Sequence, residues 1–297
     1  MASEIGWEMY RSFLAVLNEG SLSGAARALG VAQPTVGRHM ASLEKSLKLA
    51  LFTRSQTGLM ATEAALALRS FAESMNSTAA ALERAAASQG SGVRGTVRIT
   101  ASDVIGVEVL PPIIASLRDE HPELVVELVL TDRMQDLLRR EADIAVRMAR
   151  PRQELLVARR VGNVELGMYA HQRYLAGRGA PNSLADLAHH ALIGFDQPTL
   201  FIRSAGKSLG SWRREAFAMR TDNNLAQLAL IRAAAGIGVC QAGIARRDES
   251  LVRLFPRQFS LPLDTWITMH EDLRNSPRCR VAFDALFKGL RQYVKGL

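Results

Sequence analysis

The uninterrupted stretch from Glu63 to Ser88, which contains neither glycine nor proline, constrains the fold more than any other part of the sequence. At 1.5 Å per residue, a continuous helix over this stretch would be a rod of roughly 39 Å. Its side chains form a heptad seam with one polar member, made of Leu68, Phe71, Met75, Thr78, Leu82 and Ala85. Because a lone helix with one apolar stripe needs a partner, we expect it to pair with a second copy of itself. Packing on its own domain is the alternative.

The residues before this rod outline three helices. Apolar residues at helical spacing predict an amphipathic helix over residues 4–18, which Gly20 ends. Ser21 can cap a short second helix, and Gly30 supplies the turn after it. Pro34 suits the first turn of a third helix, whose buried stripe would be Val36, Met40, Leu43 and Leu47. Together they form a helix-turn-helix outline.

Shorter segments flank the rod on both sides. Residues 49–62 are β-like around Gly58 and predict a two-stranded wing, after which Thr62 can cap the long helix. The sequence GSGVRG at residues 90–95 breaks the helix and predicts a hinge.

Beyond the hinge, predicted strands and helices alternate. The expected strands are residues 93–101, 123–130, 143–148, 164–170, 191–195, 236–240 and 265–271. The expected helices are residues 110–117, a helix around residues 137–138, and a final helix over residues 277–295. This alternation predicts an α/β fold in which helices cover the faces of parallel sheets. The length of 297 residues corresponds to about two domains at ~150 residues each.

The net charge of +8 indicates a polyanionic partner. Residues 1–62 carry six basic and four acidic side chains, however, and residues 63–90 carry two basic and three acidic ones. The excess therefore lies in residues 91–297, so the case for nucleic-acid binding depends on a motif.

Composition excludes several other classes of protein. The chain is 48% hydrophobic and 22% charged, which is ordinary for a globular protein and unlike a disordered chain, a collagen or a disulfide scaffold. Cys240 and Cys279 are too few and too far apart for a metal cluster. The first residues include Glu4, Glu8 and Arg11, unlike a signal peptide, and no apolar run is long enough to span a bilayer. We therefore expect a cytoplasmic protein without a membrane partner, metal or cofactor.

From residue 20 onward the chain resembles the LysR-type transcriptional regulators. The resemblance begins with GSLSGAARALGVAQPTVGRHMASLEKSLKLALFTRS at residues 20–55 and continues through TEAALAL, RITAS, LPPIIASLRDEHPELVVEL, EADIAVR, AAAGIGV and LVRLFP. The chain departs from the family pattern at Ala50, Ala61 and Ala65, and its segment between Leu130 and Asp143 is short.

The resemblance implies three parts. These are a winged helix-turn-helix DNA-binding domain (residues 1–62), a dimerising linker helix and hinge (63–90), and a periplasmic-binding-protein-like (type 2) effector-binding domain (91–297). The last would contain subdomain I (91–163 and 267–297) and subdomain II (164–266), with the chain crossing near residues 163 and 266. The implied function is sequence-specific transcriptional regulation under a small-molecule effector. The implied partners are double-stranded DNA with an inverted repeat and further copies of the chain as a homodimer or homotetramer; contact with RNA polymerase stays open.

Within this motif, the third helix would begin near Ala32 and read the major groove. Gln33 can hydrogen-bond adenine, and Arg38 can bond guanine O6 and N7. Pro34 and the methyl group of Thr35 offer apolar contact to a thymine methyl group, and the Thr35 hydroxyl suits a phosphate.

Other residues of the motif suit the DNA backbone. The hydroxyls of Ser23 and Ser42 fit phosphates, and His39 is a candidate for a phosphate or a sugar. Gly37 either lets the helix backbone approach the groove closely or lacks a phosphate contact. Arg54 resembles the family's minor-groove or backbone arginine. For each residue the alternative is a solvated side chain.

Polar residues at predicted strand ends indicate an effector site. We expect a small organic anion, such as a carboxylate, to be held by Ser102, Thr131 and Arg147, next to Thr100. From the other half we expect contributions from Phe195, Thr199, Phe201 and Arg203. Asn223 and Asn224 cap a helix, line the site, or both. The alternative is that these polar groups cap helices and bind one another.

Two enzyme-like motifs are coincidental. GSGVRG (90–95) matches G-x-G-x-x-G but follows a helix and opens a strand, the reverse of a nucleotide fold. GKSLG (206–210) matches G-x-S-x-G but lacks the strand and helix that a nucleophile elbow needs. An enzyme with a helical oligomerisation arm and a solute-binding protein are the competing hypotheses, and the helix-turn-helix favours a non-enzymatic regulator over both.

Overall fold

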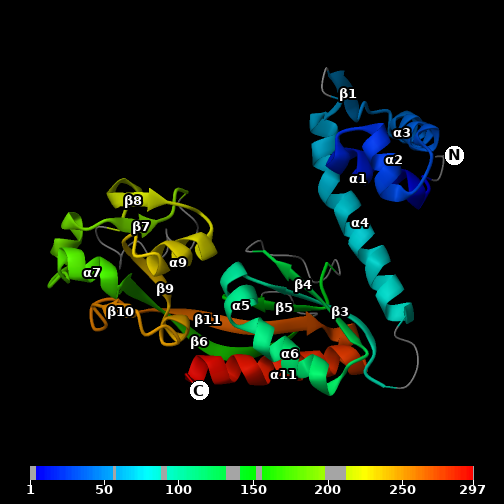
Figure 1. The fold of residues 1–297 in the computed structure, drawn as a ribbon. Helices are drawn as coiled ribbons and strands as arrows, with labels where there is room; N and C mark the ends of the chain where they lie inside the picture. Colours follow the sequence, from blue (N-terminus) through cyan, green and yellow to red (C-terminus); the bar gives the residue numbers. More distant parts are fainter. Residues whose placement is uncertain are drawn as a thin grey trace. The chain divides into compact units, whose positions relative to one another are not determined.

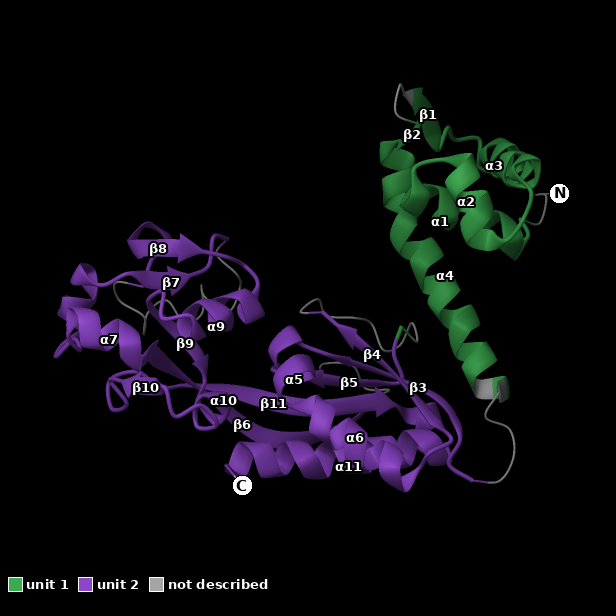
Figure 2. Cartoon of the chain, in the orientation of Figure 1, with its two compact units in different colours: residues 1–87, 138–141 green, residues 88–137, 142–297 purple. Residues whose placement is uncertain are grey.

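The computed structural model describes residues 5–55, 58–87, 92–131, 141–151, 156–197 and 212–296. The chain forms two compact units (Figure 2), one of residues 1–87 and 138–141 and the other of residues 88–137 and 142–297. Each unit has its own hydrophobic core. None of the described helices is long and apolar enough to cross a membrane.

The described residues of the first unit form four helices and a hairpin (Figure 1). In chain order they are α1 (Trp7–Glu19), α2 (Leu22–Leu29), α3 (Gln33–Leu47), β1 (Phe52–Ser55), β2 (Gly58–Ala61) and α4 (Glu63–Ala87). The predicted helix-turn-helix, wing and long helix are thus confirmed.

Local chemistry explains the helix-turn-helix. The Ser21 side chain accepts a hydrogen bond from the Gly24 amide at 3.0 Å and caps α2. Gly30 ends α2 with a φ of 68°, a left-handed conformation that glycine adopts without strain. The helices bury apolar side chains between them, among them Phe13, Val36 and Leu43, all 1% exposed or less.

The wing is fastened to this bundle by backbone hydrogen bonds. Its β1 and β2 pair antiparallel, and the amide of Leu59 donates to the carbonyl of Gly20 at 2.8 Å. At Gly58, with a φ of 134°, an added Cβ would lie 2.7 Å from the same carbonyl oxygen. The wing therefore fits closely against the turn between α1 and α2.

Helix α4 is only partly covered. The Thr62 hydroxyl accepts from the Ala65 amide at 3.2 Å, which caps the helix as predicted. Ala65 and Ala72 belong to the core of the first unit, and Leu68 of the predicted seam packs against that core. Further along, three seam residues have large exposed fractions: Phe71 60%, Met75 41% and Leu82 73%.

The second unit combines one large sheet with helices. Its strands are β3 (Gly95–Ala101), β4 (Leu124–Leu130), β5 (Ile144–Arg147), β6 (Leu156–His171), β7 (Leu192–Gly194), β8 (Phe217–Arg220), β9 (Ile237–Gln241), β10 (Leu251–Leu254) and β11 (Leu261–His270). Its α-helices are α5 (Asp103–Glu108), α6 (Leu110–Glu120), α7 (Gln172–Arg178), α9 (Asn224–Arg232), α10 (Ala242–Ala245) and α11 (Pro277–Lys295). The 3₁₀ turns among its described residues are η2 (Leu184–His189), η3 (Arg214–Ala216) and η4 (Glu271–Leu273).

The strands follow the order β4-β3-β5-β11-β6-β9-β7-β8, and β10 also pairs with β6. We call β3, β4 and β5 with their helices the first half, and β7, β8 and β9 the second half. Strand β3 is parallel to β4 and β5, and β7 is parallel to β8 and β9. In Figure 1, α11 lies along β6 and β11 with α6 beside it.

The prediction of purely parallel sheets is wrong at the centre. Strands β6 and β11 connect the two halves and run antiparallel to each other. Strand β11 is also antiparallel to β5, and β6 is antiparallel to β9. The chain crosses in one direction along β6 and returns along β11, so these two strands must oppose each other. Asn163 and Asp264 are register partners in this crossing pair.

Strand lengths also differ from expectation. The 16-residue β6 starts at Leu156, eight residues before the predicted strand. Its first part contains the exposed Arg159 and Arg160, which interrupt the apolar pattern by which a strand is recognised in the sequence. Strands β8 and β10, of four residues each, were not predicted. The helix predicted around residues 137–138 lies outside the described residues, and the final helix over residues 277–295 is confirmed.

Candidate nucleic-acid interface and effector site

The outward face of α3 carries several of the predicted DNA-contacting residues. The exposed ones are Gln33, Pro34, Arg38 and Ser42. Val36, Met40 and Leu43 anchor the opposite face in the core, which fixes the rotation of the helix. An Arg38 Nη2 donates to the Thr35 hydroxyl at 3.4 Å, so the guanidinium lies back along the helix toward its N-terminus. This face therefore presents a planar cation and an amide to solvent.

The flanking candidates lie around this face. Ser23 is exposed in the first turn of α2, and Arg54 is exposed on β1. Thr35 is half-buried. Gly37 is half-buried on the side toward α2, where an added Cβ would lie 3.9 Å from Leu22 Cδ1. A side chain at position 37 would therefore fit without displacing its neighbours.

His39 does not point fully outward. The Nδ1 atom of His39 lies 2.7 Å from the hydroxyl of Ser12 in α1. Ser12 is only 2% exposed. Ser12 could not be singled out from the sequence, because its partner is 27 residues away and no local pattern joins the two.

Glu44 is a second residue that sequence reasoning missed. Its carboxylate accepts hydrogen bonds from the amides of Leu51 at 2.7 Å and Phe52 at 3.3 Å. The Thr62 hydroxyl donates to the carbonyl of Ala50 at 2.8 Å. These contacts connect the end of α3 to the start of the wing, so they hold Arg54 and the exposed face of α3 on one small scaffold.

In the second unit, the predicted effector residues of the first half lie at the carboxyl ends of neighbouring strands. Arg147, at the end of β5, donates from Nη2 to the Thr100 hydroxyl at 2.8 Å and from Nη1 to the Val146 carbonyl at 2.9 Å. Thr100 is fully buried in β3. The amide of Thr131 donates to the Ala101 carbonyl at 2.9 Å, which brings Thr131 beside Ser102.

These contacts assemble Thr100, Ser102, Thr131 and Arg147 at one edge of the sheet. Ser102 occupies the position before α5, but its side chain makes no capping hydrogen bond there. The guanidinium of Arg147 is held by its two bonds in a fixed orientation at the strand end. The arrangement is suited to an anion, since it combines a cation with hydroxyl and amide donors.

The predicted contribution of the second half is described only in part. Phe195 is half-buried directly after β7, where the Gly194 carbonyl accepts from the Thr221 amide at 2.9 Å. Asn223 caps α9, since its side chain accepts from the Ala226 amide at 2.8 Å. Of its predicted roles, capping is therefore confirmed. Thr199, Phe201 and Arg203 lie outside the described residues, as does GKSLG (206–210).

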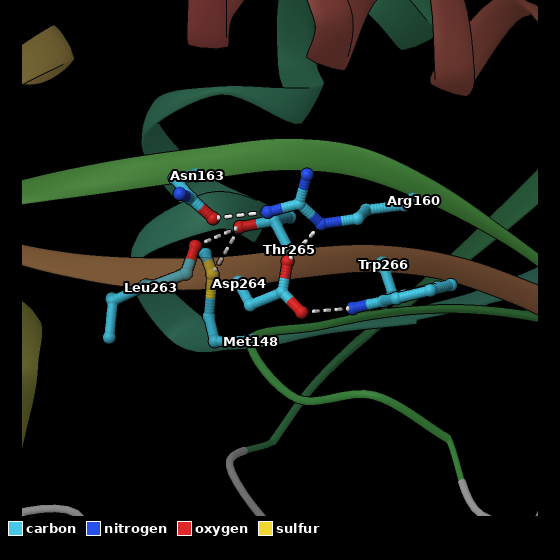
Figure 3. Close-up of polar contacts among 7 residues, drawn as sticks. All are labelled: Met148, Arg160, Asn163, Leu263, Asp264, Thr265 and Trp266. Carbon is cyan, nitrogen blue, oxygen red and sulfur yellow. Dashed lines mark hydrogen bonds and ion pairs between the residues drawn. The ribbon is translucent and has the colours of Figure 1, made fainter.

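A polar network that the sequence analysis did not predict marks the crossing strands (Figure 3). Asp264 accepts from Arg160 Nε at 2.6 Å and from Trp266 Nε1 at 2.8 Å. Arg160 also donates to the Asn163 side chain at 2.7 Å. Partial burial opposes ionisation of Asp264, but hydrogen bonds from Trp266 and Arg160 prevail and lower its pKa below the ordinary value.

The hydroxyl of the buried Thr265 makes two further contacts beside this network. It donates to the Leu263 carbonyl at 3.0 Å and lies 2.9 Å from the sulfur of Met148, directly after β5 (Figure 3). The strand pairing shifts register between Thr265 and Trp266. The network thus fixes the point where β6 and β11 pass from one half to the other, next to the end of β5.

A second contact bridges the halves through helix ends. Arg232, at the end of α9, makes a bidentate ion pair with Glu108, at the end of α5, with N–O distances of 2.7 and 2.9 Å. Arg247 donates to the Glu108 carbonyl at 2.9 Å. The hydrogen bonds from Arg232, opposed by partial burial, lower the pKa of the Glu108 carboxyl.

The part of the chain that the structure describes contains no candidate metal site. No group of three or more His, Cys, Asp or Glu side chains there could hold a metal ion. Cys240 and Cys279 are both buried and form no disulfide with each other. Burial raises the pKa of the Cys240 thiol to about 12, which keeps it protonated and unreactive at neutral pH.

Comparison with family models finds matches over both units. The model described as bacterial regulatory helix-turn-helix protein, lysR family, matches residues 7–66. The model described as LysR substrate binding domain matches residues 90–291.

Individual relatives agree with these matches. An HTH-type transcriptional regulator of Xanthomonas campestris pv. campestris (strain 8004) is 28% identical over 181 residues, 61% of this chain and 53% of that protein. The Mau operon transcriptional activator of Paracoccus denitrificans is 33% identical over 164 residues, 55% of this chain and 58% of that protein. These matches thus span less than two thirds of either relative. The crystal structure of full-length CbnR complexed with its target DNA has the same fold, with a TM-score of 0.67, 20% identity, and coverage of 97% of this chain and 99% of that chain.

Proposed function

Because this chain belongs to the LysR family of transcriptional regulators, we propose that it binds an inverted-repeat DNA site as a dimer or tetramer and that a small organic anion controls this binding. The family consists of regulators, not enzymes. Within it, the DNA contacts, the effector and the oligomeric state are the proposals that follow.

The proposal of DNA binding rests on the outward face of α3. Gln33 and Arg38 are exposed on it, and the buried stripe behind them keeps the face turned outward. Gln33 would hydrogen-bond an adenine and Arg38 a guanine in the major groove. Ser23, Ser42 and Arg54 would contact the DNA backbone around this face. Two such faces in a symmetric oligomer would read an inverted repeat.

A titration of the full chain with the DNA upstream of its own gene tests this function. The apparent Kd, measured by fluorescence anisotropy at several salt concentrations, should be lower for this fragment than for a scrambled one of equal length. Affinity should fall as salt rises, because phosphate contacts release counterions. Equal affinity for both fragments at every salt concentration would contradict sequence-specific binding.

The effector site would lie at the carboxyl ends of β3, β4 and β5. Arg147 would pair with the anion while Ser102 and Thr131 hydrogen-bond it, and Phe195 would contribute from the second half. Such an effector can act on DNA binding only if it binds two states of the protein with different affinity. Contacts that bridge the halves, such as Glu108 with Arg232, are candidates for what differs between those states.

A panel of small mono- and dicarboxylic acids, screened by thermal shift, would test this site. The acid that stabilises the wild type is then titrated into Arg147→Ala and into Arg257→Ala, a control that removes an exposed arginine elsewhere in the second unit. We expect affinity to fall at least about tenfold for Arg147→Ala only, since a charge-assisted pair is lost. Full affinity of Arg147→Ala would overturn the assignment.

A further inference from the structure

The hydroxyl of Ser12 is a buried polar group with one partner. Ser12 is 2% exposed within α1, and its Oγ lies 2.7 Å from Nδ1 of His39 on α3. A buried hydroxyl needs an acceptor for its proton. The hydroxyl of Thr78 in α4 finds one in the carbonyl four residues earlier, Ser74, at 2.9 Å. Ser12 makes no such backbone bond among the described residues, so its proton goes to Nδ1.

This bond determines which nitrogen of His39 carries a proton. A neutral imidazole has one N–H and one acceptor nitrogen. Because Nδ1 accepts from Ser12, the proton lies on Nε2. His39 is half-buried. Its Nε2 makes no hydrogen bond to another described residue and is not fully buried, so this N–H reaches solvent.

The position of His39 on α3 determines what this N–H would meet. His39 lies one turn after Thr35, on the side of α3 toward α1, and not on the outermost face with Arg38 and Ser42. When a recognition helix lies in the major groove, its outermost face meets base edges and its sides meet the sugar–phosphate walls. The Nε2–H of His39 is therefore placed for a phosphate oxygen.

We propose that Ser12 is a positioning residue for DNA binding, which holds His39 as the Nε2–H tautomer so that this N–H donates to a backbone phosphate. The inference depends on the proposed function, because it names a further contact of the same interface. It also assigns a role to a residue of α1 that touches no DNA itself. A purely structural Ser12 would instead only fasten α1 to α3.

A double-mutant cycle distinguishes these roles. Ser12→Ala, His39→Asn and the double variant are titrated with the upstream fragment and with random-sequence DNA, and folding is checked by thermal unfolding. The asparagine amide can still reach Ser12 but not the phosphate. We expect each single change to weaken binding to both DNAs about five- to tenfold. We expect Ser12→Ala to have no further effect in the His39→Asn background.

Two further readouts separate the outcomes. The salt dependence of log Kd should be unchanged in His39→Asn, since a neutral donor displaces no counterion, whereas loss of a cation lowers the slope by about one. His39→Gln, whose amide reaches the position of Nε2, should retain more affinity than His39→Asn. Additive losses in the cycle, or a lowered salt slope, would overturn the positioning role while DNA binding stands. If the wild type itself does not prefer its upstream DNA, the proposed function fails instead.

Discussion

Single side chains show where local pattern is sufficient and where it is not. Helical periodicity alone predicts that Gln33 and Arg38 face outward, because Val36 and Leu43 must be buried. In the structure Gln33 and Arg38 are exposed, and Val36 and Leu43 are buried. The residues that hold this interface in place, by contrast, could not be predicted from a local pattern. Ser12 and Glu44 act on residues in other elements, and nothing in the nearby sequence marks a hydroxyl or a carboxylate for such a bond.

Arg38→Ala should weaken binding to the cognate site by about 1–3 kcal/mol and relax the preference at one base pair, because a bidentate contact to guanine is lost. Lys45→Ala is the matched control, since it removes one exposed charge from the C-terminal part of the same helix. The control should weaken cognate and random DNA alike. Binding measured by anisotropy on a set of single-base variants checks both. Equal losses on all DNAs for Arg38→Ala would mean that it contacts only phosphate.

Two glycines of the first unit should respond in opposite ways to alanine. Gly37→Ala should raise the free energy of unfolding by about 0.5–1 kcal/mol, since glycine is unfavourable within a helix and the new Cβ has room 3.9 Å from Leu22. Gly58→Ala should lower it by about 1 kcal/mol or more, because the Cβ would lie 2.7 Å from the Gly20 carbonyl oxygen at a φ of 134°. Denaturant unfolding measures both changes. A destabilised Gly37→Ala would show that position 37 is more crowded than this structure indicates.

At the scale of elements, α4 leaves the clearest apolar surface exposed to solvent. Leu68 packs against the core of the first unit, whereas Phe71, Met75 and Leu82 project apolar side chains from the helix. The sequence predicted the helix and its seam, because periodicity reports a stripe. Periodicity could not tell which residues of the stripe pack on the chain's own core and which pack on a partner, because apolar residues are buried in both cases.

Phe71→Glu should weaken or abolish dimer formation, because a carboxylate would be buried in the seam between two copies of α4. Leu66→Glu is the control: Leu66 is 54% exposed but lies on another side of the helix. Sedimentation velocity over a range of concentrations should show monomers for Phe71→Glu and the wild-type assembly for Leu66→Glu. An unchanged assembly in Phe71→Glu would exclude this seam as the interface.

For the whole chain, the alternation of strands and helices predicted the α/β class and most strand positions, but not the antiparallel pairing of β6 with β11 at the sheet's centre. Exposed arginines interrupt the apolar pattern of β6. The contact between Glu108 and Arg232 joins residues 124 positions apart, which only tertiary structure can reveal. The position of Phe195 followed from the predicted strand that precedes it. The other effector residues predicted from that half, Thr199, Phe201 and Arg203, lie outside the described residues.

The Glu108–Arg232 pair should make the stability of the second unit depend on pH. The hydrogen bonds from Arg232 hold the folded-state pKa of Glu108 below its usual 4.5, so the pair stabilises the fold fully above that pH and loses its effect as the pH falls through the lowered value. Glu108→Gln should lower the free energy of unfolding by about 1 kcal/mol at pH 7, and the difference should shrink as the pH falls through the lowered pKa of Glu108. Urea unfolding at each pH measures it. Glu249→Gln, at an exposed site, should show no difference, and a constant Glu108→Gln deficit at every pH would contradict the ion-pair explanation.

The central claim is that α3 enters the major groove as one of a symmetric pair. Hydroxyl-radical footprinting of the full chain on its upstream DNA tests this most directly. We predict two protected segments related by an inverted repeat, their centres separated by a whole number of turns of about 10–10.5 base pairs, and weaker protection of both in Arg38→Ala at the same protein concentration. A single protected segment, or protection that Arg38→Ala leaves intact, would contradict the claim.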